Sequence, residues 1–252
     1  MAITFKPEGR LSGFETKSKA RAEDICRVSS LLKLGGDHAM LGKWLGEATA
    51  ERHLPLSPAS SFYMRSCRRR LLGAIHQHFN DSGFADSHIR VFTIINSRWF
   101  IPAGSLSACS AASIKAKFRR YLERALVIDA EGLLFAGLHG SFDGAGYQLH
   151  YHGIVAGDKV KALENLRGNF GFVSSKDVYR SLQFEKLNDP PRQISYTLQS
   201  WWPFEPQPPE AFALGKRMRL PPDSHAEFLL WMANQNLMDL ITMVGCVSGT
   251  AD

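Results

Sequence analysis

The sequence predicts an α+β protein with a central, mainly antiparallel sheet, in the order β-α-β-β-α-β-α, and with helical additions at both ends. Three observations point to this class. Helical periodicity dominates residues 22–80, and a run of β-branched and aromatic residues follows at 89–95. The turn Asp143-Gly144-Ala145-Gly146 then separates two strand-like runs, as in a hairpin. The expected parts are a helical lead-in at 1–80, a central domain at 81–202, and a Pro-rich linker with a C-terminal helix at 203–252.

The lead-in ends in an amphipathic helix at 61–79. Its apolar residues recur at helical spacing, and arginines gather on its other face. These are Arg65, Arg68, Arg69 and Arg70. A solvated helix face and a contact with nucleic-acid phosphates are both open interpretations of this cluster.

The central elements alternate between strand and helix patterns. After the strand at 89–95, a helix is expected at 112–126, with an apolar stripe through Ile114 and Phe118. Four basic residues lie largely off that stripe: Lys115, Arg119, Arg120 and Arg124. The remaining expected elements are strands at 133–142 and 147–157, a helix at 158–166, a strand at 179–187 and a helix at 192–201.

The C-terminal part is expected to hold one more helix. Ser224-His225-Ala226-Glu227 has the pattern of a capping box, which marks a helix start. Apolar residues continue to Leu240 and Ile241, and Gly245 is expected to end the helix.

Bulk properties suit a globular protein inside the cell. The chain has 252 residues, of which 44% are hydrophobic, and a formal net charge of +6. Its four cysteines are widely spaced, which argues against metal fingers and a disulfide framework. The first residues lack the apolar core of a secretory signal, and no apolar run is long enough to cross a bilayer. We therefore expect a cytoplasmic protein without a membrane partner, whose basic excess suits a polyanion.

Two histidines stand on the second strand of the predicted hairpin. Side chains alternate faces along a strand, so His150 and His152 point the same way, about 6–7 Å apart. A symmetric hairpin centred on Gly144-Ala145 places His139 opposite His150, and directly opposed residues share a face. The apolar alternation of both strands agrees with this register. Three imidazoles on one face can bind a divalent cation and leave positions open for substrate, although histidines without a metal are the plain alternative.

The tripeptide His150-Tyr151-His152 resembles the His-hydrophobic-His motif of HUH endonucleases, which include rolling-circle replication initiators, transposases and relaxases. The order of elements over residues 88–201 is similar as well. The resemblance implies a Rep-like fold in which His139, His150 and His152 bind Mn²⁺ or Mg²⁺ at the scissile phosphate. Histidines that precede the tyrosine in the chain are typical of initiators and transposases.

The nucleophile of that family is a tyrosine, often in a Tyr-x-x-Lys pattern. Tyr196 is the candidate here, and Gln199 stands where the lysine would be. Arg192 or Lys186 can supply the missing charge, or the enzyme can be impaired. Tyr179 is the second candidate, and a tyrosine with only a packing role is the alternative for Tyr196.

The resemblance implies metal-dependent nicking and joining of single-stranded or hairpin DNA through a tyrosyl-DNA intermediate, as in plasmid or phage replication. The residues expected to contact DNA are Arg68, Arg69, Arg70, Lys115, Arg119, Arg120, Arg124, Arg192 and Gln199. The chain has no GxxxxGK[ST] run, so unwinding would need a host helicase. A DNA-binding protein with this fold that has lost cleavage is one alternative. An unrelated three-histidine hydrolase is another, disfavoured because no glutamate base stands nearby.

Overall fold

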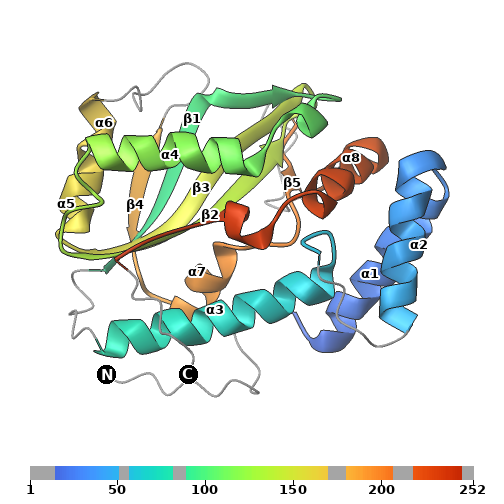
Figure 1. Ribbon diagram of the computed structural model, residues 1–252, viewed down its shortest axis with the longest axis horizontal. Helices are drawn as coiled ribbons and strands as arrows, with labels where there is room; N and C mark the ends of the chain where they lie inside the picture. The colour runs from blue at the N-terminus through green and yellow to red at the C-terminus, as the bar shows by residue number, and fades with distance from the viewer. Residues whose placement is uncertain (1–14, 51–56, 82–88, 170–179, 207–217, 246–252) are drawn as a thin grey trace.

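The computed structural model describes residues 15–50, 57–81, 89–169, 180–206 and 218–245. Its strands are β1 (Ile89–Pro102), β2 (Gly132–Phe142), β3 (Gly146–Gly157), β4 (Leu182–Lys186), β5 (Pro203–Phe204), β6 (Met218–Arg219) and β7 (Ile241–Val244). They form one curled, mostly antiparallel sheet (Figure 1). The order is β4-β1-β3-β2; β5 and β6 continue from one end of β2, and β7 pairs with its other half. The α+β class and the mainly antiparallel sheet are thereby confirmed.

The described helices follow the expected order. They are α1 (Lys17–Leu32), α2 (Gly36–Ala50), α3 (Ser61–Asp81), α4 (Ala111–Arg124), α5 (Lys159–Glu164), α6 (Leu166–Asn169), α7 (Pro190–Tyr196) and α8 (Pro222–Ala233), with the 3-10 helices η2 (Leu106–Ala108) and η4 (Leu237–Leu240). The central part runs β1-α4-β2-β3-α5-β4-α7, with α6 following α5, and α1 to α3 precede it. Within the described ranges, no helix is both long and apolar enough to cross a bilayer.

The β2–β3 hairpin has the predicted register. His139 pairs with His150, Gly137 with His152 and Phe142 with Tyr147. The turn is tied by the Asp143 carboxylate, which accepts hydrogen bonds from the backbone N–H groups of Ala145 and Gly146 at 2.8 and 2.9 Å. Gly144 has φ +105°, a value that few residues other than glycine adopt. The turn residues therefore fix which side chains face each other along both strands.

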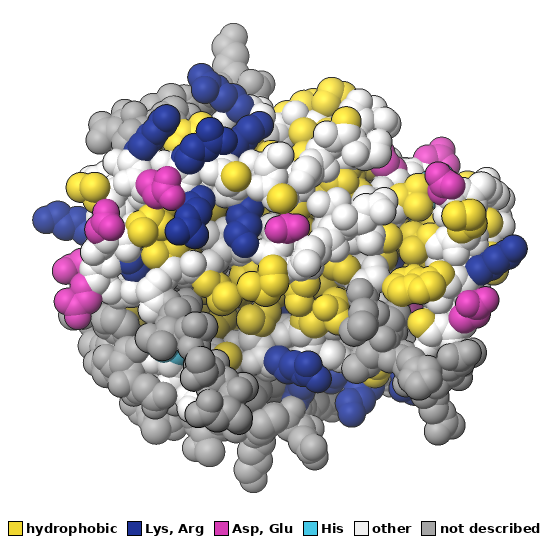
Figure 2. All heavy atoms as spheres, viewed as in Figure 1, with side chains coloured by type: hydrophobic (Ala, Val, Ile, Leu, Met, Phe, Trp, Pro, Cys, Tyr) yellow, Lys and Arg dark blue, Asp and Glu magenta, His cyan; other side chains and the backbone are white. Residues whose placement is uncertain are grey.

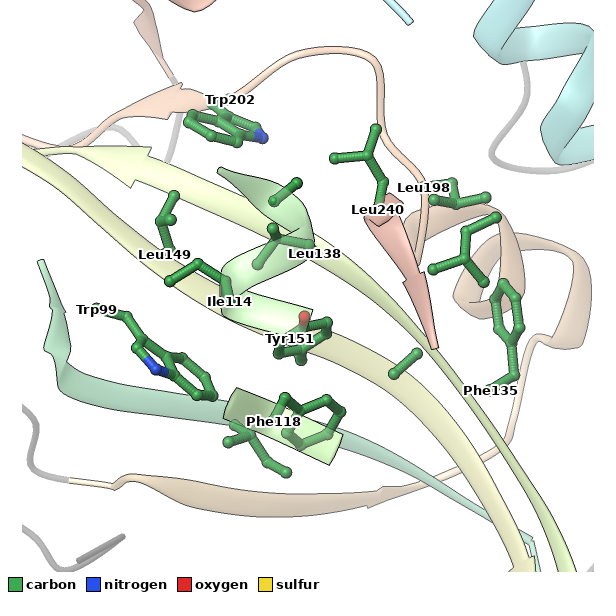
Figure 3. Packing of buried hydrophobic residues seen from close by; sticks show 14 of the residues in the cluster. Trp99, Ile114, Phe118, Phe135, Leu138, Leu149, Tyr151, Leu198, Trp202 and Leu240 are labelled. Carbon is green, nitrogen blue, oxygen red and sulfur yellow. The ribbon is translucent and has the colours of Figure 1, made fainter. Parts of the chain in front are cut away.

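The sheet has two differently covered faces. On one face α4 packs through Phe118, whose ring stacks on Tyr151 at a centroid distance of 4.1 Å, with Trp99 edge-on to both rings (Figure 3). Burying each such side chain contributes roughly 1.5–3 kcal/mol. Trp202 extends this core toward α8, where it packs on Trp231. The other face carries α7, with α3 beyond it (Figure 1).

Two buried residues of α1, Asp24 and Arg27, tie this helix to α3 and to the segment that follows α7. The Asp24 carboxylate accepts hydrogen bonds from the backbone N–H groups of Ser61 and Phe62, and so caps the start of α3. The Arg27 guanidinium donates to the carbonyl of Ser200, at 2.7 Å, and to that of Ala59. The lead-in is thus tied directly to the segment that follows α7.

Two central elements differ from their predicted bounds. The first strand continues to Pro102 because the ladder resumes at Phe100 after a register shift that begins at Ile95. The helix expected at 192–201 spans Pro190–Tyr196 instead. The Asp189 side chain caps its start, and at its end the Thr197 hydroxyl donates to the carbonyl of Ile194.

The C-terminal expectation was wrong in two respects. The helix begins at Pro222 without a side-chain cap, so Ser224 and Glu227 form no capping box. The Glu227 carboxylate instead accepts hydrogen bonds from the Tyr147 hydroxyl and from two backbone N–H groups near η2. The helix also ends at Ala233, well before Gly245. The β-branched residues of Ile241–Val244 form β7, which pairs with β2 and extends the sheet.

Candidate metal centre

Three histidines meet on one face of the β2–β3 hairpin. His139 and His150 are directly opposed, and His152 lies two residues further along β3. One ring nitrogen from each residue lies within 4.8 Å of the other two. His139 and His150 are 3% and 9% exposed, whereas His152 is only partly buried. The group therefore combines two enclosed donors with one that remains accessible.

Hydrogen bonds orient two of the three rings. Nδ1 of His150 lies 3.1 Å from the carbonyl oxygen of Gln148 and donates to it, which makes Nε2 the acceptor nitrogen of this ring. Nδ1 of His152 lies 2.8 Å from the hydroxyl of Thr93, its direct partner on β1. Metal-binding histidines are usually held in this way, with one ring nitrogen anchored and the other ligating.

His139 is oriented differently. Its Nε2 accepts a long hydrogen bond, 3.4 Å, from the backbone N–H of Gln199. One lone pair cannot serve both a hydrogen bond and a metal. Metal binding through Nε2 therefore has to release Gln199, whereas binding through Nδ1 leaves this contact in place.

The residues present fit a divalent cation. Metal–nitrogen bonds of about 2.0–2.1 Å require the donor nitrogens to lie within roughly 4 Å of one another. The three nitrogens lie within 4.8 Å of one another, which is close to that separation. A buried group of His139, His150 and His152 could thus hold a metal ion. Three protein donors leave coordination positions for a substrate oxygen or water.

Tyr196, the predicted nucleophile, lies against this group. Its ring centroid is 4.7 Å from that of His152 and 5.5 Å from that of His139. The flanking residues Ile194 and Leu198 are buried and anchor this part of the chain on the sheet. The structure therefore brings the four central residues of the predicted site together on one face. Tyr179, the second candidate, lies outside the described residues.

A pocket of about 470 Å³ opens beside the histidines. It lies between β1, β4 and α7, and both His152 and Tyr196 line it. Thr93, Gln183, Glu185 and Arg192 are among its other walls. A substrate that reaches the candidate metal therefore has a defined cavity next to it.

The basic residues of α4 lie on the opposite face of the sheet from the histidines. The apolar side of α4 covers Tyr151, which alternates with His150 and His152 along β3. Its exposed cations point away from the sheet and gather on the face shown in Figure 2. Arg119 pairs with Glu123, and the Lys115 ammonium donates to the carbonyl of Met238. Together with Arg120 and Arg124 they form a surface separate from the candidate metal centre.

The arginines of α3 divide between core and surface. Arg68 is 5% exposed and forms a salt bridge with Glu15. Arg69 is partly buried, and Arg70 is exposed. Unlike α4, α3 contacts α7, the helix that carries Tyr196 (Figure 1).

Arg192 and Gln199 flank Tyr196 in two different ways. Arg192 is exposed and lines the pocket. The backbone N–H of Gln199 donates to Nε2 of His139. Gln199 therefore contacts the site through its main chain, whereas the lysine of the family pattern would offer a charged side chain. Lys186 is exposed at the end of β4, and its carbonyl accepts a hydrogen bond from Gln193.

Sequence reasoning missed Thr93 and the β4 side of the site. Alternation along β1 predicts which side of the strand Thr93 lies on. It does not predict which residue of β3 Thr93 pairs with, because no tight turn joins β1 to β3 and sets their register. The same holds for Gln183 and Glu185, which pair with Thr93 and Val91 across β1 and β4. No motif in the sequence marks these residues.

Comparisons of the chain with protein-family models, with curated proteins and with solved structures found no match.

Proposed function

We propose that this protein nicks and rejoins single-stranded DNA with Tyr196 as the nucleophile, in the manner of the HUH endonucleases that its histidine motif resembles. The observation that carries the proposal is the contact of the Tyr196 ring with His139 and His152. A phosphate bound at the histidine group would lie within reach of a tyrosine hydroxyl on α7. Near-attack geometry of this kind, with reacting atoms about 3–3.5 Å apart, lowers the barrier because little further ordering is needed.

The reaction is a transesterification. The Tyr196 oxygen attacks the phosphorus, and the bond from phosphorus to the 3′ oxygen breaks. The 3′ oxygen leaves as a hydroxyl after it takes up a proton, while the phenol loses one. The phosphotyrosyl link conserves the energy of the broken ester, so attack by a 3′-hydroxyl restores the strand. Arg192 at the pocket supplies the cation that the lysine of a Tyr-x-x-Lys pattern would have provided.

The histidine group would hold the divalent cation. When bound, the cation polarises the phosphoryl oxygen and offsets its charge. Of the two cations expected from the resemblance, Mn²⁺ suits three imidazole donors better, because Mg²⁺ prefers oxygen ligands. His150 and His152 are held by Gln148 and Thr93, and need no large rearrangement to bind it.

A covalent adduct tests the proposal. The full chain is incubated with 3′-labelled single-stranded hairpins of randomised loop sequence and Mn²⁺, and the products are separated under denaturing conditions. We expect a labelled protein band that disappears in Tyr196→Phe. Tyr121→Phe, on α4 across the sheet, is the matched control and should keep the band. A band that survives in Tyr196→Phe would reject this nucleophile and make Tyr179 the next residue to test.

A second function is favoured by one observation. Gln199 stands where the family has lysine, and its main chain is tied to His139. A protein with this arrangement can bind DNA without cutting it. Single-stranded DNA binding by the parent chain, with no adduct in any of Mn²⁺, Mg²⁺, Co²⁺ or Zn²⁺, would establish the binding-only function.

A further inference from the structure

The pocket beside the histidines has the size of a ligand site. Its volume of about 470 Å³ falls within the range of about 300–1,000 Å³ that is typical of small-molecule sites. His152 and Tyr196 both line it, so an occupant lies next to the candidate metal and nucleophile.

Strand pairing brings the polar walls of the pocket onto the histidine face. Thr93 pairs with His152 on β3 and with Gln183 on β4. Directly opposed residues share a face, so Gln183 lies on the same side of the sheet as His152. Glu185, two residues further along β4, lies on that side as well.

Three polar side chains around the pocket are unengaged. Glu185, Asn188 and Arg192 line it and are exposed. Within the described part of the chain, their side-chain ends form no hydrogen bond or ion pair. By contrast, the Gln193 amide accepts from two backbone N–H groups of the β4–α7 loop and donates to Lys186, and so holds the loop in place. The pocket thus combines a fixed wall with free polar groups.

The side chains that line the pocket match the parts of a nucleotide. The Arg192 guanidinium suits a phosphate, and the flat ring of Tyr196 suits an unstacked base. An ionised Glu185 carboxylate only accepts hydrogen bonds, so it pairs with the amino group of a base and opposes a carbonyl oxygen. A free phosphate has no base, and a plain sugar has neither a base nor a phosphate, so neither would engage all three side chains.

We infer that the pocket binds one unstacked nucleotide of single-stranded DNA, next to the phosphate that is cut, and that Glu185 makes it prefer a base with an exocyclic amino group over thymine or uracil. The inference rests on the proposed function, because it takes single-stranded DNA as the substrate. Proteins that recognise single strands commonly read splayed bases through stacking and through hydrogen bonds to their edges.

Cytosine and uracil provide the sharpest comparison, because the amino group of one is replaced by a carbonyl in the other. Fluorescence anisotropy with Mn²⁺ measures the affinity of the full chain for labelled oligodeoxycytidine and oligodeoxyuridine of equal length. We expect the cytidine strand to bind at least about fivefold more tightly, the lower end of what one base-edge contact discriminates. Glu185→Ala should remove this preference and leave uridine binding no weaker. Glu164→Ala, on α5 and outside the pocket, removes the same charge and should keep it.

The outcomes separate this inference from the proposed function. Equal affinity of the parent chain for both strands, or an unchanged preference in Glu185→Ala, overturns the inference even if the covalent adduct forms. A preference that depends on Glu185 supports it even if no adduct forms. Failure to bind either strand overturns it outright.

Discussion

The carbonyl oxygen of Thr197 lies directly over Gly137, so close that a Cβ built on this glycine would be 1.6 Å from that oxygen. Gly137 is the partner of His152 in the hairpin, and Thr197 follows Tyr196 at the end of α7. The missing side chain therefore permits the approach that sets Tyr196 against the histidines.

Gly137→Ala should push the end of α7 away from the sheet. We expect a loss of about 1–3 kcal/mol in the free energy of unfolding, as for other overpacked sites, and a large fall in adduct formation. Urea denaturation and the adduct assay measure the two effects. Gly46→Ala is the control, because its Cβ would meet Val28 at an ordinary 3.5 Å. Equal stability of the two variants would show that α7 does not depend on this contact.

The hydroxyl of Thr93 should tune metal affinity through His152. Thr93→Val keeps the shape of the side chain but removes the 2.8 Å hydrogen bond to Nδ1. We expect Mn²⁺ to bind about 10–100-fold more weakly, which is the usual effect of removing such a partner. Thr93→Ser, which keeps the hydroxyl, should restore most of the affinity in isothermal titration calorimetry. A valine variant with parental affinity would show that the hydroxyl plays no part in holding the ring.

Metal binding should weaken as the pH falls, because an imidazole must be deprotonated to coordinate. Below the ordinary histidine pKa of about 6.5, each ligand adds to the dependence of the apparent Kd on pH. His139→Ala should therefore flatten this dependence as well as weaken binding. The His150→Ala/His152→Ala variant should bind hardly at all, whereas His38→Ala on α2 should match the parent. Parental affinity in the double variant would mean that the metal binds elsewhere.

Local patterns in the sequence predicted the centre of the site but not its surroundings. The hairpin register followed from the turn at Asp143–Gly146 and from alternation, and these suffice to place His139 opposite His150. The contact of Tyr196 with the histidines was reached through the family resemblance. The early end of α7 depends on the fit of Thr197 over Gly137, which is a tertiary contact that helical periodicity does not contain.

Two other features of the fold also depend on tertiary contacts that the sequence pattern does not contain. The run Ile241–Val244 continues an apolar pattern that suits a helix, but in the structure it pairs antiparallel with β2 as a strand. Periodicity also placed the basic face of α4 toward solvent without saying on which side of the sheet that helix lies. Only the stacking of Phe118 on Tyr151 assigns α4 to the face opposite the histidines.

His225 should make stability fall in mildly acidic solution. Burial, together with the charges of Arg27 and Arg219, lowers the pKa of this histidine to about 4, against 6.5 for an unperturbed one. The unfolded chain therefore takes up a proton first as the pH falls. Above about pH 6.5 His225 is neutral in both states and the free energy of unfolding has its full value. Between pH 6.5 and 4 that free energy falls progressively, by an amount on the order of 2–3 kcal/mol.

Urea denaturation of metal-free protein at pH 7, 6 and 5 measures this loss. His225→Gln cannot titrate, so its stability should fall less than that of the parent over the same interval. Parallel curves for the two proteins would assign the acid sensitivity to other groups, such as the histidines of the candidate metal centre.

The two basic surfaces should differ in their contribution to DNA binding. Each phosphate contact on a single strand adds about 0.7 to the slope of log affinity against log salt concentration, because a counterion is released. Arg192 lines the pocket beside His152, whereas Lys115, Arg119, Arg120 and Arg124 lie across the sheet. A short strand bound at the histidines meets Arg192 and cannot reach the outer face of α4 at the same time. We therefore expect Arg192→Gln to lower the slope by about 0.7 for a short oligonucleotide. The fourfold alanine variant of α4 should leave that slope unchanged. A lower slope in the α4 variant and an unchanged one in Arg192→Gln would place the DNA on the opposite face of the sheet, away from the histidines.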